Sequence, residues 1–104
     1  MKSASECGNM AELRVLIDAL DRRLVALLAE RSACIDRASA IKHDAGLPAR
    51  IDDRVAEVIA NVRAEAARNG LDPDLAAALW TTLVEWSIAR EERALGENSK
   101  EPDA

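Results

Sequence analysis

Aromatic side chains are almost missing from this sequence of 104 residues, which contains two tryptophans and neither phenylalanine nor tyrosine. Sandwiches and small barrels of β-strands normally fill their interiors with aromatic and β-branched residues, so this composition argues against an all-β fold. Only 4 glycines and 3 prolines are present, which leaves few turns. Alanine, leucine, arginine and glutamate, all strong helix formers, are abundant. We therefore expect an all-α domain built from a few long helices.

Cysteine and histidine are also scarce. Cys7 and Cys34 lie far apart in the chain, and neither they nor the single histidine, His43, belong to a metal-ligand spacing. We therefore expect two free thiols and no metal site. No apolar run approaches the length of a membrane span, and the N-terminal residues lack the apolar core of a signal peptide. We expect a cytoplasmic protein with no membrane partner.

The charge balance is acidic, with a formal net charge of −5 at pH 7. Proteins that bind nucleic acids need a basic face, so we expect no nucleic-acid partner. The net charge does not exclude a local pocket of cations.

Capping and breaking residues predict a very long first helix. Asn9 can cap a helix, and no glycine or proline follows until Gly46, so this helix is predicted to run to about Asp44. At 1.5 Å per residue it spans roughly 50 Å. We expect a flexible N-terminal segment over 1–8, a helical domain over 9–96 and a disordered tail over 97–104.

Two shorter helices are predicted to follow. The second begins at Asp52 and ends at Asn69-Gly70, and the third is opened by Asp72-Pro73 and ends near Gly96. The second helix carries an apolar stripe formed by Val55, Val58, Ile59, Val62 and Ala66. The third carries a predicted apolar face formed by Leu75, Leu79, Trp80, Leu83 and Val84.

The first helix is too long for two shorter helices to cover within one chain. Its apolar residues alternate at spacings of four and three, the seam of a coiled-coil-like pair. This seam consists of Leu13, Ile17, Leu20, Leu24, Leu27, Cys34, Ala38 and Ile41. We therefore expect three helices per chain, intertwined as an antiparallel homodimeric helical bundle.

One cation interrupts the seam, because Arg31 stands where an apolar residue belongs. Burying an arginine without a partner costs several kcal/mol. Arg31 therefore either pairs with a nearby glutamate, reaches solvent, or binds an anionic ligand. Lys42 lies three turns further on nearly the same side, and an antiparallel copy would bring Arg14 of the partner subunit between the two. This geometry predicts two equivalent sites, each built from both chains.

Other side chains extend this cluster. Arg54 stands at the start of the second helix, where the helix dipole favours anions. Ser87 and Glu91, four residues apart, continue the apolar stripe of the third helix and are either solvated surface or pocket lining. A cationic pocket without a Ser–His pair, an activated cysteine or a metal is suited to a small dianion or dicarboxylate. Any catalysis would depend on electrostatic stabilisation and positioning.

The ordered set of polar residues resembles the all-helical chorismate mutases and their close relatives, the isochorismate pyruvate lyases. The resemblance covers residues 9–95 and rests on Arg14, Arg31, Lys42, Arg54 and Ser87, with the segments 13–14, 26–31 and 70–72. It implies an intertwined homodimer with two shared active sites and no cofactor. The implied substrate is a dicarboxylate enolpyruvyl ether, either chorismate, which rearranges to prephenate, or isochorismate, which gives salicylate and pyruvate.

The resemblance also implies roles for individual residues. Arg31 and Arg14 of the partner subunit would hold the two carboxylates, with Arg54 assisting. Lys42 would contact the ether oxygen as its bond breaks, so truncating Lys42 should lower turnover more than substrate binding. Glu91 aligns with a position that is often glutamine and that donates a hydrogen bond to the same oxygen. We expect Glu91 to act only when protonated, with activity improving toward acidic pH, unless the register is off by one and Glu91 faces solvent.

Two apolar residues depart from the mutase pattern. Ile51 and Val55 stand where typical mutases carry an acidic residue and a glutamate. The lyase is also apolar there, and it too has an alanine matching Ala38 and an isoleucine matching Ile88. Mutases are the commoner members, and lyase-type sites can retain mutase activity. Chorismate mutase is therefore our first expectation, isochorismate pyruvate lyase the alternative, and a non-catalytic helical dimerisation module the alternative of a different class.

Overall fold

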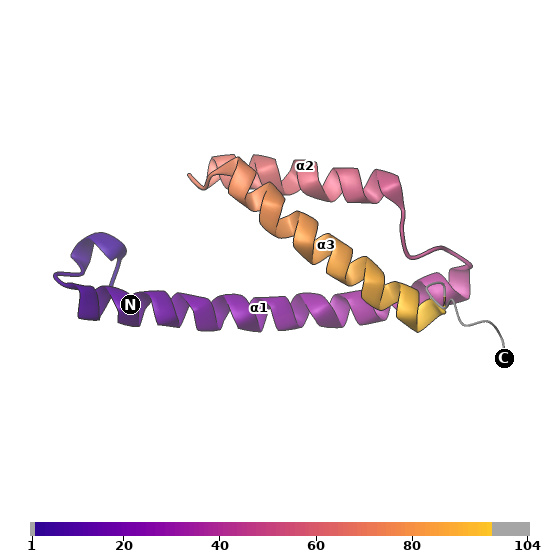
Figure 1. Cartoon of the computed structure of the whole chain (residues 1–104), viewed down its shortest axis with the longest axis horizontal. Helices are drawn as coiled ribbons and strands as arrows, with labels where there is room; N and C mark the ends of the chain where they lie inside the picture. The colour runs from indigo at the N-terminus through magenta and orange to yellow at the C-terminus, as the bar shows by residue number, and fades with distance from the viewer. Residues whose placement is uncertain (1, 97–104) are drawn as a thin grey trace. The chain divides into compact units, whose positions relative to one another are not determined.

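The computed structural model describes residues 2–96. It contains three α-helices, α1 (Met10–Ala45), α2 (Asp52–Arg68) and α3 (Pro73–Leu95), preceded by the short 3-10 helix η1 (Ala4–Glu6) (Figure 1). No strand occurs among the described residues. The expected all-α fold with one very long helix is therefore confirmed. The tail predicted over 97–104 lies outside the described residues.

The helices begin and end where local sequence signals predict. The Asn9 side chain accepts a hydrogen bond from the Glu12 backbone N–H at 2.9 Å, which satisfies one of the free donors at the start of α1. Asp72 caps α3 in the same way through the Asp74 N–H, also at 2.9 Å. The C-cap of α3, Gly96, has a φ of 78°, a left-handed conformation that glycine adopts without strain.

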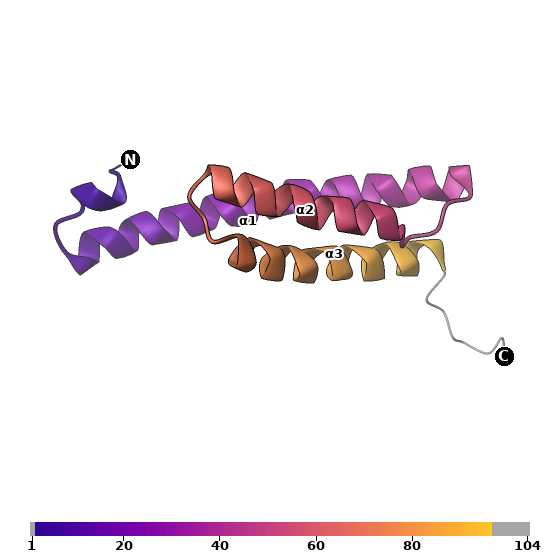
Figure 2. The same ribbon diagram turned by 90° about the horizontal axis from the view of Figure 1, so that it is seen from above.

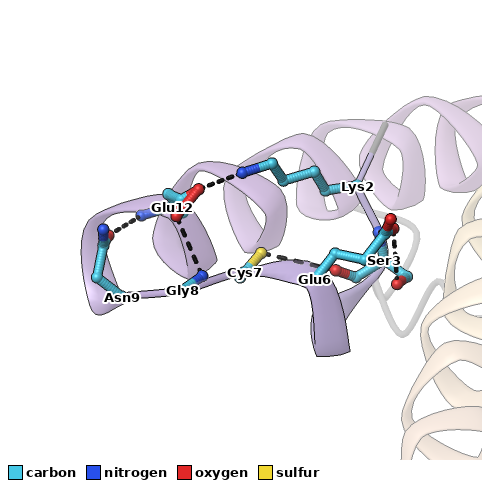
Figure 3. A network of polar contacts seen from close by, with 7 residues as sticks. All are labelled: Lys2, Ser3, Glu6, Cys7, Gly8, Asn9 and Glu12. Atoms are coloured by element: carbon cyan, nitrogen blue, oxygen red, sulfur yellow. Dashed lines mark hydrogen bonds and ion pairs between the residues drawn. The ribbon is translucent and has the colours of Figure 1, made fainter.

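The chain divides into two compact units, one ending at Cys34 and the other beginning at Ile35. In the first unit, polar contacts join the residues on either side of η1 to the start of α1 (Figure 3). Glu12 forms an ion pair with Lys2 and accepts the Gly8 N–H at 3.1 Å, and these contacts lower the pKa of its carboxyl. Glu6 likewise accepts the Ser3 N–H at 2.8 Å, which lowers the pKa of Glu6. The N-terminal segment predicted to be flexible thus contains a hydrogen-bonded turn in the structure.

The second unit contains the last turns of α1, a connection over 46–51, and a hairpin of α2 and α3. The two hairpin helices pack against each other and run in opposite directions (Figure 2). The unit has a small hydrophobic core, whose buried members are Ala49, Val84 and Ile88 and whose partly buried neighbours are Val55, Val58, Ile59 and Leu95. The apolar stripe predicted for α2 is confirmed, since all five of its residues are buried or half-buried.

The apolar face predicted for α3 is only partly buried in the single chain. Leu75 and Leu79 are 46% and 50% exposed, respectively. The helix instead buries Ala76, Ala77, Val84, Ser87, Ile88 and Glu91. The buried side of α3 is thus formed by small, apolar and polar residues, and Leu75 and Leu79 lie outside it. Burial along α3 is therefore decided by packing rather than by hydrophobicity alone.

Large apolar side chains along α1 remain exposed in the single chain. Among the seam residues, Leu24 and Leu27 are 57% and 59% exposed, and Ile17 and Leu20 are also exposed. An uncovered apolar row of this length is a feature of surfaces that associate. No described helix is long and apolar enough to cross a membrane.

Candidate functional site in the second unit

The ammonium group of Lys42 is held by two oxygen atoms. It donates a hydrogen bond to the Ala49 carbonyl at 2.7 Å and lies 2.6 Å from Oε1 of Glu91. The Lys42 side chain is 18% exposed and that of Glu91 only 6%. Lys42 comes from the last turns of α1 and Glu91 from the last turns of α3, so this ion pair joins two helices at the edge of the core.

The chain after α1 brings the Ala49 carbonyl back to Lys42. Gly46 adopts a left-handed φ of 70°, and the Leu47 N–H donates to the Lys42 carbonyl at 2.8 Å, which reverses the chain direction at the helix end. Ala49 is then almost fully buried beside Val84 and Ile88. Because burial fixes this residue, its carbonyl is a firmly placed acceptor for the ammonium.

Glu91 is buried, which overturns the alternative that it faces solvent. It follows Val84, Ser87 and Ile88 on the buried side of α3 at helical spacing. A buried carboxylate is costly unless a cation compensates it, and Lys42 supplies that cation. Oε1 lies outside hydrogen-bond alignment with the ammonium and has no other hydrogen-bond partner in the described part of the chain. The pair is therefore held by charge rather than by directed hydrogen bonding.

The four apolar side chains predicted for the site are buried or half-buried, and two of them belong to the core. Val55 and Ile88 belong to the cluster around Ala49. Ile51 is the half-buried N-cap residue of α2, and Ala38 is a half-buried residue one turn before Lys42. The acceptor of the Lys42 hydrogen bond thus sits in an apolar environment, where electrostatic interactions are stronger than in water.

The polar site residues Ser87 and Arg54 have partners on their own helices. The buried Ser87 hydroxyl donates to the Leu83 carbonyl at 2.8 Å, one turn earlier on α3. Arg54 is exposed, and its guanidinium forms an ion pair with the Glu57 carboxylate at 2.6 Å. The remaining predicted cations, the exposed Arg14 and the half-buried Arg31, belong to the first unit.

Sequence reasoning missed the ion pairs of the second unit that join distant parts of the chain, among them one between α3 and the connection over 46–51 and one between α1 and α3. Arg50 contacts Glu85 at 2.5 Å, and the pKa of Arg50 is raised by this carboxylate. Asp36 binds Arg90, which lowers the pKa of the Asp36 carboxyl. These partners are far apart in the chain, so no helical spacing rule could have found them. Among residues 2–96 no three side chains are grouped as metal ligands.

Comparison with known proteins identifies the family. The family model for chorismate mutase type II matches residues 13–92, which include every predicted site residue. The chain belongs to the chorismate mutase type II family. As predicted from the sequence, its relatives include both mutases and a lyase.

Three relatives illustrate this range. An isochorismate pyruvate lyase from Pseudomonas aeruginosa is 32% identical over 92 residues, 88% of this chain and 89% of that protein. A chorismate mutase from Methanocaldococcus jannaschii is 25% identical over 89 residues, 86% of this chain and 90% of that protein. A T-protein from Enterobacter agglomerans is 36% identical over 68 residues, 65% of this chain but 18% of that protein. The names of these relatives thus include two different activities, those of a lyase and of a mutase.

The buried ion pair generates a prediction for stability. We expect Lys42→Met to destabilise the fold by about 3 kcal/mol, because it leaves the Glu91 carboxylate buried without a cation. The double variant Lys42→Met/Glu91→Leu should recover most of that loss, since apolar residues can replace a buried pair at little cost. Urea unfolding of the single and double variants measures both effects. Equal destabilisation by the single and double variants would contradict the pairing.

Proposed function

We propose that this protein is a chorismate mutase that rearranges chorismate to prephenate without a cofactor. The observation that carries the proposal is the largely buried Lys42 ammonium, held in an apolar setting by Ala49 and Glu91. In the rearrangement the ether carbon–oxygen bond breaks, and negative charge develops on the oxygen. A pre-positioned cation in a low-dielectric site stabilises that charge more in the transition state than in the bound substrate.

The ammonium has the capacity to serve a ligand. A lysine carries three N–H donors, and the described hydrogen bond of Lys42, to the Ala49 carbonyl, uses one of them. The ether oxygen of a bound substrate would take another donor. In this proposal Arg31 and Arg14 of the partner subunit hold the two carboxylates, assisted by Arg54, whose present contact with Glu57 is exposed and therefore weak.

A second candidate activity is the release of pyruvate from isochorismate to give salicylate. It is favoured by the apolar character of Ile51 and Val55, because no carboxylate at those positions is available for a ring hydroxyl, and by the resemblance of Ala38 and Ile88 to the lyase pattern. The lyase from Pseudomonas aeruginosa is also similar to most of this chain. Both reactions break the same type of ether bond, so Lys42 would serve either one. The third possibility, a non-catalytic helical dimerisation module, predicts turnover of neither substrate.

One pair of assays separates these three functions. We expect the purified protein to consume chorismate, and salicylate formation from isochorismate to report the second activity. In Lys42→Gln, kcat should fall by about a hundredfold or more while KM changes little, since the cation acts on charge that develops in the transition state. Arg63→Gln, which removes an exposed α2–α3 ion pair, is the matched control. Absence of turnover with both substrates would contradict both enzymatic functions and favour the non-catalytic dimerisation module.

The protonation of Glu91 is open to a separate test. Its carboxylate contacts Lys42, and a dianionic substrate would bring further negative charge to the same ammonium. Protonation of Glu91 removes the repulsion between its carboxylate and the anionic substrate, and it supplies a hydrogen-bond donor to the ether oxygen. We expect kcat/KM to increase as the pH falls below neutrality, and Glu91→Gln to flatten this profile. A profile that is identical in the two proteins argues against a role for Glu91 at the reacting oxygen.

We also propose that two copies form an antiparallel homodimer along α1, with each active site shared. The exposed seam residues of α1 support this proposal, because a second copy would bury them. We expect sedimentation equilibrium to give a dimer. Leu24→Asp should weaken the dimer at least about tenfold, because it places a carboxylate in the apolar seam, and it should lower activity in parallel. Ala33→Asp, at an exposed position off the seam, is the matched control. A monomeric wild-type enzyme with full activity would contradict the shared site.

A further inference from the structure

A second ion pair between α1 and α3 accompanies the Lys42–Glu91 pair. Asp36 receives two hydrogen bonds from Arg90, from Nε at 2.5 Å and from a terminal nitrogen at 3.0 Å. The guanidinium also lies over the ring of Trp86, with Cζ 5.4 Å from the ring centroid. A two-pronged bond and a stacked plane together restrict the direction of the arginine far more than a single contact could.

The two ion pairs are arranged so that they fix the position of the last turns of α1 along α3. Arg90 and Glu91 are adjacent on α3, whereas Asp36 and Lys42 are six residues apart on α1, or about 9 Å along the helix. The two ion pairs start at separate positions on α1 and end at neighbouring residues of α3. Together they therefore resist sliding of one helix along the other. Ser39 lies between Asp36 and Lys42 in the sequence of α1 and is buried. Its hydroxyl donates a hydrogen bond to the Ile35 carbonyl at 3.2 Å.

The Asp36–Arg90 pair is suited to positioning rather than to stabilisation. Both side chains are about half exposed, and ion pairs of this kind contribute little to the free energy of unfolding. Close backbone packing holds α2 to α3, whereas the ion pairs named here join the last turns of α1 to α3 through long side chains. The placement of Lys42 therefore depends on these side chains.

We propose that Asp36 and Arg90 are positioning residues that hold Lys42 at the place where it acts on the breaking ether bond. The inference rests on the proposed function, and it assigns to this exposed pair an effect on turnover without any contact with substrate. A shift of about 1 Å in a catalytic group can lower a rate by as much as about a hundredfold. The arginines proposed to hold the substrate carboxylates are not part of this link.

Kinetic measurements on four variants test the proposal. We expect Asp36→Asn and Arg90→Gln each to lower kcat by about tenfold, with KM within about twofold of the wild type, because a displaced Lys42 affects the transition state and not the binding of the carboxylates. The charge-reversed double variant Asp36→Arg/Arg90→Asp should recover most of the lost kcat. Arg63→Gln, which breaks an exposed ion pair between α2 and α3, should leave kcat unchanged. A loss in Asp36→Asn that the double variant does not recover would overturn the pairing as its cause.

A second readout does not depend on activity. The sequence contains only three lysines, Lys2, Lys42 and Lys100, so the side-chain NMR signals of lysine are few and Lys42 can be assigned with Lys42→Arg. We expect the Lys42 signal to shift in Asp36→Asn and Arg90→Gln, to return in the double variant, and to stay in place in Arg63→Gln. An unchanged Lys42 signal in both single variants overturns the positioning role. A wild-type protein that turns over neither substrate refutes the proposed function instead, and the NMR result then still decides whether Asp36 and Arg90 place Lys42.

Discussion

The need to compensate the Lys42 ammonium organises the second unit of this protein. A cation on a side chain that is only 18% exposed must find oxygen partners, and it finds one on α3 and one on the connection after α1. Glu91 is buried for the same reason, since its own charge is tolerated only beside Lys42. One electrostatic requirement thus brings α1, the connection over 46–51 and α3 together at a single point.

The same arrangement connects stability with the proposed chemistry. A cation fixed in an apolar setting before substrate arrives needs little reorganisation when charge develops on an ether oxygen. Glu91 keeps the ammonium compensated in the unliganded protein, and the proposed pH dependence follows from the change in its surroundings when a dianion binds. The exposed Asp36–Arg90 pair adds geometric control, because its two-pronged bond is directional even though it contributes little to stability.

The candidate site was predictable to the extent that it depends on spacing along a helix. Ser87 and Glu91 share a face of α3 because they are four residues apart, and Lys42 follows Ala38 by one turn for the same reason. The role of the Ala49 carbonyl as an acceptor for Lys42 could not be predicted, because the residue type does not indicate which backbone carbonyl will accept a hydrogen bond from a side chain. The Arg50–Glu85 and Asp36–Arg90 pairs were also out of reach, since each joins residues separated by many positions and many other pairings of opposite charge were equally open.

The sequence by itself determined the helical class, the ends of the helices and the uncovered seam of α1, because capping residues, glycines and apolar periodicity act over a few neighbouring positions. The tertiary structure alone decided which side of α3 is buried. In the single chain Leu75 and Leu79 are exposed, whereas Ala76, Ala77 and the polar Ser87 and Glu91 are buried. The tertiary structure also decided that Glu91 is the ion-pair partner of Lys42. A buried charge selects its counter-ion by distance and by exclusion from water, and both arise only when separate helices pack together.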